Sequence, residues 1–201
     1  MKVLYITLFV VIVDQLTKVA VKGFNLKFFS LSYKGMDLYS SIEIIEGFLK
    51  VTFVENPGMV LGINVGAKLF FVLFSIFASM GILFYLYKMR KETCWLRVPL
   101  ALILGGAFGN LIDRIFYGVF YGEAPLFYGK VVDFIELKIF RMEFFGYQLT
   151  SWPVFNVADI AITIGVFILI VFHGKISRII DIREEPILKV PIPKLYKSIL
   201  E

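Results

Sequence analysis

The sequence contains one cysteine, Cys94, and one histidine, His173, among its 201 residues. A lone cysteine cannot form an internal disulfide, and one histidine cannot build a zinc cluster. These two counts exclude disulfide scaffolds and zinc hydrolases before any motif is considered. We therefore expect a chemistry that requires neither a metal nor a cofactor.

The amino-terminal segment lacks a signal-peptide cleavage site. MKVLYITLFVVIVDQLTK has the charged start and apolar core of a secretory signal, but no small-x-small sequence follows that core. Asp14 and Lys18 interrupt the segment where cleavage would fall. We interpret it as a retained first helix.

Apolar residues dominate the remainder, since 59% of the chain is hydrophobic and the mean hydropathy is +0.82. A soluble domain is typically about 45–50% apolar. Four segments approach the roughly 20 residues that cross about 30 Å of hydrocarbon, at residues 3–21, 67–87, 95–118 and 155–173. The sequence therefore predicts a polytopic α-helical membrane protein with four transmembrane helices.

Basic residues indicate the orientation of these helices. They gather at the amino terminus, between the second and third segments, and in the tail, as Lys2, Lys88, Arg90, Lys91, Arg97, Lys175, Arg178 and Arg183. By the positive-inside rule both termini are cytoplasmic. We predict a membrane domain over 1–175, outer loops over 22–66 and 119–154, and a cytoplasmic tail over 176–201. The net charge of +5 then reflects topology, and no nucleic-acid partner is expected.

The two outer loops carry strand patterns. Residues 42–56 and 131–145 alternate apolar and polar side chains and are rich in β-branched and aromatic residues. We predict a small β-rich extracytoplasmic subdomain that rests on the outer membrane surface.

With this topology, a set of residues that are polar except for Gly58 falls in one layer near the outer membrane face, and its members are associated with all four helices. They are Asp14, Lys18, Asn56, Gly58, Asn110, Asp113, Arg114, Asp133, Asn156 and Asp159. Asp14 with Lys18, and Asp113 with Arg114, are expected to form structural ion pairs, because buried charges need partners. The small residues Gly105, Gly106 and Gly109 are expected to permit close helix packing.

Asp133 and Asp159 are not assigned to a structural pair of this kind. Two close carboxylates cannot both ionise easily, so one keeps a proton while the other activates water. Serine–histidine and cysteine–histidine systems are excluded, because His173 and Cys94 fall at the cytoplasmic side. A dyad of Ser151 and Lys138 stays open, although nothing but location marks either residue.

Five motifs add a resemblance to this interpretation. DQLTK, NPGMVLG, GGAFGNLIDR, VVDF and FNVAD, in this order over residues 1–175, resemble the lipoprotein signal peptidases (signal peptidase II) of bacteria. That family consists of aspartyl endopeptidases of the cytoplasmic (inner) membrane. They remove the signal peptide from prolipoproteins, cutting on the amino-terminal side of a cysteine that carries diacylglycerol.

The resemblance implies roles for individual residues. It implies that Asp133 and Asp159 are the catalytic pair and that Asp14 and Lys18 stabilise the fold. The residues implied to shape and support the site are Asn56, Gly58, Asn110, Asp113, Arg114, Asn156 and Ala158. The resemblance also implies contact with membrane lipid and inhibition by the cyclic peptide globomycin, and we expect a monomer.

Three stretches depart from the family pattern. Met59, Val60 and Leu61 stand where the family prefers small residues and an aromatic. The spacing from Asp113 to Asp133 is long because residues 117–130 intervene, and the stretch before FNVAD is extended. Our hypothesis is that these aromatic insertions form a flap or an enlarged platform over the site.

Two other classes of function stay open. A small proton-coupled transporter would also place carboxylates in the membrane, but it should carry polar groups across the whole depth. The inner halves of the second and fourth segments are apolar, which argues against transport. A non-catalytic assembly factor that binds lipoproteins would tolerate loss of Asp133 or Asp159, whereas a peptidase would not.

Overall fold

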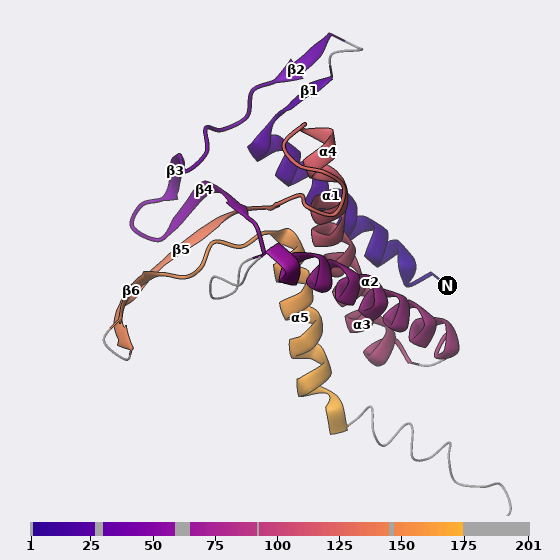
Figure 1. Cartoon of the computed structure of the whole chain (residues 1–201). Helices are drawn as coiled ribbons and strands as arrows, with labels where there is room; N and C mark the ends of the chain where they lie inside the picture. The colour runs from indigo at the N-terminus through magenta and orange to yellow at the C-terminus, as the bar shows by residue number, and fades with distance from the viewer. Residues whose placement is uncertain (1, 27–29, 59–64, 92, 145–146, 175–201) are drawn as a thin grey trace, which may run out of the picture.

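The computed structural model describes residues 2–26, 30–58, 65–91, 93–144 and 147–174 (Figure 1). The predicted tail over 176–201 lies outside this range. The elements follow in the order α1 (Leu4–Lys22), β1 (Phe24–Leu26), β2 (Leu31–Tyr33), β3 (Ser41–Ile45), β4 (Leu49–Asn56), α2 (Val65–Lys88), α3 (Cys94–Ile112), the π-helix η2 (Asp113–Tyr117), α4 (Gly118–Phe120), β5 (Val131–Phe144), β6 (Tyr147–Ser151) and α5 (Val157–Val171).

Three helical stretches are long and apolar enough to cross a membrane: Leu4–Lys22, Lys68–Lys88 and Cys94–Phe120. Many large apolar side chains on these helices face outward, such as Phe9, Phe70 and Phe84, at 67%, 63% and 68% exposure. Lipid is the natural solvent for such surfaces. The chain is therefore a helical membrane protein, as its composition predicts.

The fourth predicted span is shorter than expected. α5 has 15 residues, which at 1.5 Å per residue cover about 22 Å, less than the roughly 30 Å of hydrocarbon. Its predicted first residue, Phe155, instead exchanges backbone hydrogen bonds with Ile135 of β5. Asn156 then caps the helix, so α5 begins at Val157.

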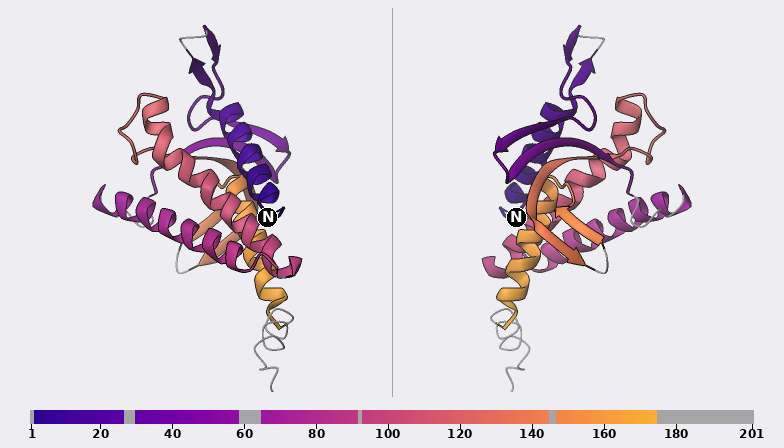
Figure 2. Two further views of the ribbon diagram at one scale, coloured as in Figure 1. Left: turned by 90° about the vertical axis from the view of Figure 1, so that its right-hand side faces the viewer. Right: turned by 90° about the vertical axis from the view of Figure 1, so that its left-hand side faces the viewer.

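α3 lies at the centre of the helices, with α1 and α5 packed along it, and α2 crosses it obliquely (Figure 2). Glycines make these contacts close. A Cβ at Gly105 would lie 2.8 Å from Cβ of Val10, and one at Gly106 would collide with the carbonyl oxygen of Ala158. The predicted packing role of these glycines is confirmed.

The β-structure forms two separate pieces. β3, β4, β5 and β6 make a four-stranded antiparallel sheet in that order, which extends to one side of the helices in Figure 1. β1 and β2 form a separate hairpin directly after α1. The strand patterns over 42–56 and 131–144 are confirmed, while β6 and the β1–β2 hairpin were not predicted.

Helix packing at Gly106 can be tested by adding a single methyl group. Gly106→Ala is expected to reduce the free energy of unfolding by about 1–3 kcal/mol, because the backbone of α5 must move aside. Gly81→Ala in α2 is the control, since no atom lies within 4 Å of its added Cβ. Thermal melting in detergent should show a lower midpoint for Gly106→Ala alone, and equal midpoints would contradict the close contact.

Candidate active site

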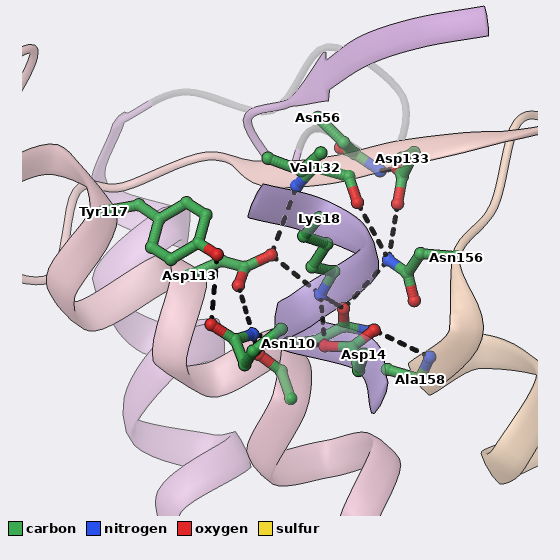
Figure 3. Close-up of polar contacts among 12 residues, drawn as sticks. Asp14, Lys18, Asn56, Asn110, Asp113, Tyr117, Val132, Asp133, Asn156 and Ala158 are labelled. Atoms are coloured by element: carbon green, nitrogen blue, oxygen red, sulfur yellow. Dashed lines mark hydrogen bonds and ion pairs between the residues drawn. The ribbon is translucent and has the colours of Figure 1, made fainter. Parts of the chain in front are cut away.

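Lys18 lies at the centre of the polar layer and is fully buried. Its Nζ is 2.8 Å from Oδ2 of Asp14 and 2.8 Å from Oδ2 of Asp113. It also donates a 2.9 Å hydrogen bond to Oδ1 of Asn110 (Figure 3). The predicted pair of Asp14 with Lys18 is confirmed, and a second acid shares the same lysine.

Gln15 and Tyr117 complete this cluster, although the sequence reasoning missed both. Nε2 of Gln15 donates to Asp14, Asp113 and the carbonyl oxygen of Gly109, at 3.2, 2.9 and 3.1 Å. The hydroxyl of Tyr117 donates to Oε1 of Gln15 at 3.0 Å and thereby fixes the orientation of its amide. Gln15 could have been found from the sequence, because it is a polar residue of the DQLTK motif within an apolar helix.

The two acids of the Lys18 cluster also bind backbone amides of other elements. Oδ1 of Asp14 accepts from the backbone N–H of Ala158 in α5, at 2.9 Å. Oδ2 of Asp113 accepts from the backbone N–H of Val132 in β5, at 3.2 Å. α5 and β5 carry Asp159 and Asp133, so the Lys18 cluster fixes the elements on which both aspartates stand.

Asn156 bridges the two aspartates. Its Nδ2 donates to Oδ1 of Asp133 at 2.6 Å, while its backbone N–H donates to Oδ2 of Asp159 at 3.2 Å. Asn110 donates to Oδ1 of Asp159 at 2.9 Å, and Asn56 donates to Oδ2 of Asp133 at 3.1 Å. The structure therefore brings together both predicted catalytic residues and three predicted supporting asparagines.

Gly58 sets the direction of one of these asparagines. Its backbone N–H donates to Oδ1 of Asn56 at 2.9 Å, which leaves Nδ2 of Asn56 to face Asp133. Gly58 has a φ of 79°, a conformation that glycine adopts without a steric cost. Its predicted support role therefore has a structural basis, whereas residues 59–61, the first departure from the family pattern, lie outside the described residues.

Charge is unevenly distributed around the two aspartates. Lys18, whose charge acts on Asp133, is already shared by Asp14 and Asp113. Within the described part of the chain, neither Asp133 nor Asp159 takes part in an ion pair. Burial raises the pKa of Asp133 from 3.8 to about 6, and the charge of Asp159 adds to the effect, against an opposing hydrogen bond from Asn56.

The predicted ion pair between Asp113 and Arg114 is wrong. Asp113 begins the π-helix η2 and turns its carboxylate toward Lys18 of α1. No ion pair of Arg114 is found among the residues that the structure describes, and its backbone carbonyl accepts from the N–H of Gly129 at 3.0 Å. Neighbouring residues on one helix point in different directions, so adjacency in sequence did not make them partners.

A groove of about 360 Å³ opens beside Asp159. Its other walls are apolar side chains of β5, α5 and the segment between β6 and α5, with one hydroxyl: Leu137, Trp152, Phe155, Ile160, Thr163 and Ile164. The carboxylate of Asp159 stands at one end of an apolar surface that follows α5. The groove can therefore hold an apolar chain next to the carboxylate of Asp159.

Comparison with known proteins agrees with this chemistry. A family model described as "Signal peptidase (SPase) II" matches residues 6–174. The lipoprotein signal peptidase of Syntrophus aciditrophicus is 40% identical over 139 residues, which cover 67% of this chain and 74% of that protein. The one from Pelodictyon phaeoclathratiforme is 34% identical over 171 residues, which cover 85% and 89%. A solved bacterial membrane enzyme is similar in fold, with a TM-score of 0.63, 31% identity, and coverage of 85% and 90%.

Together, the helical membrane fold and these matches define a membrane-bound aspartic peptidase. Within that class, the chain belongs to the signal peptidase II family, the lipoprotein signal peptidases.

The buried lysine offers a direct test of the cluster. Lys18→Met keeps the apolar stem but leaves Asp14 and Asp113 without a cation, so we expect the free energy of unfolding to fall by about 3–5 kcal/mol. Lys34→Met is the control, because the Lys34–Asp37 pair is 82% and 76% exposed. Denaturation in detergent should separate the two variants, and a Lys18→Met protein as stable as the control would contradict this role.

Proposed function

We propose that this enzyme removes signal peptides from diacylglyceryl-modified prolipoproteins, cutting on the amino-terminal side of the lipidated cysteine. Asp133 and Asp159 act as the catalytic dyad. The observation that carries this proposal is the bridge of Asn156 between two aspartates that have no ion pair within the described residues. Such a pair favours one shared proton over two charges.

The proposed reaction divides the roles of the dyad by protonation state. Asp133 holds the proton, in line with its raised pKa, and donates a hydrogen bond to the scissile carbonyl oxygen. Asp159 removes a proton from water, and the resulting hydroxide attacks the carbonyl carbon. When the tetrahedral intermediate collapses, the C–N bond breaks and the amine of the lipidated cysteine leaves with a proton from the dyad.

The groove beside Asp159 supports an apolar substrate. A signal peptide and a diacylglyceryl group both partition into lipid, so the scissile bond reaches the enzyme from the side, near the outer membrane face. We propose that α5 completes a set of four transmembrane helices with both termini in the cytoplasm. This orientation puts the dyad at the outer face of the cytoplasmic membrane, where a lipidated cysteine lies.

The proposal includes two statements about partners. Globomycin, the inhibitor implied by the family resemblance, should block the dyad by occupying the same site. The enzyme is also proposed to act as a monomer, since the contacts between the dyad and its supporting side chains need no second copy.

Loss of either aspartate should abolish cleavage. Asp133→Asn and Asp159→Asn are each expected to lower kcat by about a hundredfold to ten-thousandfold, because general acid–base catalysis is removed. Asp37→Asn in the exposed outer region is the matched control. The measurement is cleavage of a diacylglyceryl-modified prolipoprotein in detergent, with folding verified by thermal melting. Cleavage at the wild-type rate by either folded dyad variant would reject the dyad.

The raised pKa of Asp133 leads to a pH prediction. The dyad needs one proton, and Asp133 loses it as the pH rises through about 6. We therefore expect kcat/KM to be highest below that pH and to fall by about tenfold per pH unit above it. A profile of kcat/KM from pH 4.5 to 8.5 checks this, and a rate that is flat between pH 5 and 8 would contradict it.

A further inference from the structure

A second cluster of charged residues lies next to the polar layer that holds the two aspartates, and the proposed reaction does not use it. Nζ of Lys22, the last residue of α1, contacts Glu55 of β4 and lies 2.8 Å from Oε1 of Glu123. Nζ of Lys130, just before β5, lies 2.7 Å from the other carboxylate oxygen of Glu55. We call Lys22, Glu55, Glu123 and Lys130 the outer ion-pair cluster.

The inner half of this cluster is buried. The side chains of Lys22 and Glu55 are 7% and 8% exposed, whereas those of Glu123 and Lys130 are 41% and 43% exposed. The ring of Tyr121 covers the lysine, with Nζ of Lys22 4.2 Å from the ring centre. Buried ions that have lost water tolerate little change in geometry, because each depends on its partner.

The cluster contacts the insertion over 117–130, the segment that departs from the family pattern. Glu123 and Tyr121 both belong to this insertion, and the hydroxyl of Tyr121 donates to the carbonyl oxygen of Gly23 at 2.7 Å. Farther along, the carbonyl oxygen of Tyr128 accepts from Lys68 of α2 at 2.8 Å. The insertion is thus tied to the ends of α1 and α2 through named contacts.

Glu55 connects this insertion to the dyad through one peptide bond. Asn56, the next residue, donates to Oδ2 of Asp133 at 3.1 Å. The strand register reinforces the connection, because Asn56 pairs with Val131 and Val54 pairs with Asp133. Lys130 is the residue before Val131, so the Lys130–Glu55 ion pair clamps β4 to β5 at the point where Asn56 meets Asp133.

We propose that Glu55 is a positioning residue, which the outer ion-pair cluster holds in place so that Asn56 stays hydrogen-bonded to Asp133. This inference rests on the proposed catalytic function of Asp133. It gives the insertion over 117–130 a specific task, which is to complete the cluster with Glu123, Tyr121 and Lys130 and so hold the β4–β5 edge of the site. The insertion then acts through Asn56 and needs no contact with the substrate.

The test is Glu55→Gln, which keeps the size of the side chain and removes its charge. When Asn56 is no longer held, kcat should fall by about tenfold to a hundredfold, because small displacements of catalytic groups have large effects on rate. KM should change less than about twofold. The midpoint of the kcat/KM profile should move upward by about half a pH unit or more, because a carboxylate that loses a hydrogen bond is easier to protonate.

The direction of that shift separates positioning from simple charge loss. The charged groups that face Asp133 are Asp159 of α5 and Lys18 of α1, and the substitution changes neither. Removing the negative charge of Glu55 would by itself lower the midpoint, since fewer anions then oppose ionisation of Asp133. An upward shift therefore identifies the lost hydrogen bond from Asn56.

Two further variants keep the test decisive if Glu55→Gln folds poorly. Glu55→Asp keeps the charge and should recover part of the wild-type kcat. Glu123→Gln removes only the half-exposed acid and should move kcat and the midpoint in the same direction by a smaller amount. Glu43→Gln is the control, because the Glu43–Lys138 pair lies on the same sheet, away from Asn56, and is 42% and 39% exposed.

The outcomes distinguish this inference from the proposed function. A wild-type enzyme that does not cleave the lipidated substrate contradicts the proposed function. An active wild type with Glu55→Gln matching it in kcat and midpoint overturns the positioning role alone. A rise in KM with unchanged kcat also overturns it, because Glu55 would then act on substrate binding.

Discussion

The arrangement of the site depends on a single buried cation. Lys18 is shared by Asp14 and Asp113, and these two acids also accept hydrogen bonds from backbone amides of α5 and β5. A buried ammonium group needs these partners, so Lys18 connects α1, α3, α5 and the sheet in one place. This pairing also has a chemical consequence, because the charge of Lys18 is already balanced by Asp14 and Asp113 and is not paired with Asp133 or Asp159.

Amide side chains, rather than charges, therefore surround the dyad. Asn56, Asn110 and Asn156 donate hydrogen bonds to the two aspartates and supply no full charge. Hydrogen bonds orient a carboxylate and favour its ionised form, and an ion pair would add the attraction of a full charge to that effect. In the proposed mechanism, a pair oriented in this way shares one proton and activates water.

From the sequence, it was easier to predict which residues lie in the polar layer than which of them contact each other across helices. Spacing of four residues along a helix predicted the Asp14–Lys18 pair, and the length of the apolar segments predicted three long helices.

Contacts between helices could not be predicted in this way. Spacing along one helix says nothing about them, so Asp113 was assigned to Arg114 instead of Lys18. The late start of the fourth helix, at Val157 after Asn156, was hidden for the same reason, because it depends on a bridge between Phe155 and Ile135 of β5. Nothing in the sequence distinguishes Glu55 from other strand residues, because its partners Lys22 and Lys130 come from distant parts of the chain.

The proposal that the two aspartates share one proton is tested most directly by infrared titration of the purified enzyme in lipid. Protonated carboxyl groups have a C=O stretching band that carboxylates lack, so the spectrum counts them. In the difference spectrum between the wild type and Asp133→Asn, the band of one protonated carboxyl group should be present at pH 5 and lost with a midpoint of about 6. A difference spectrum without such a band at pH 5 would contradict a single proton held by Asp133.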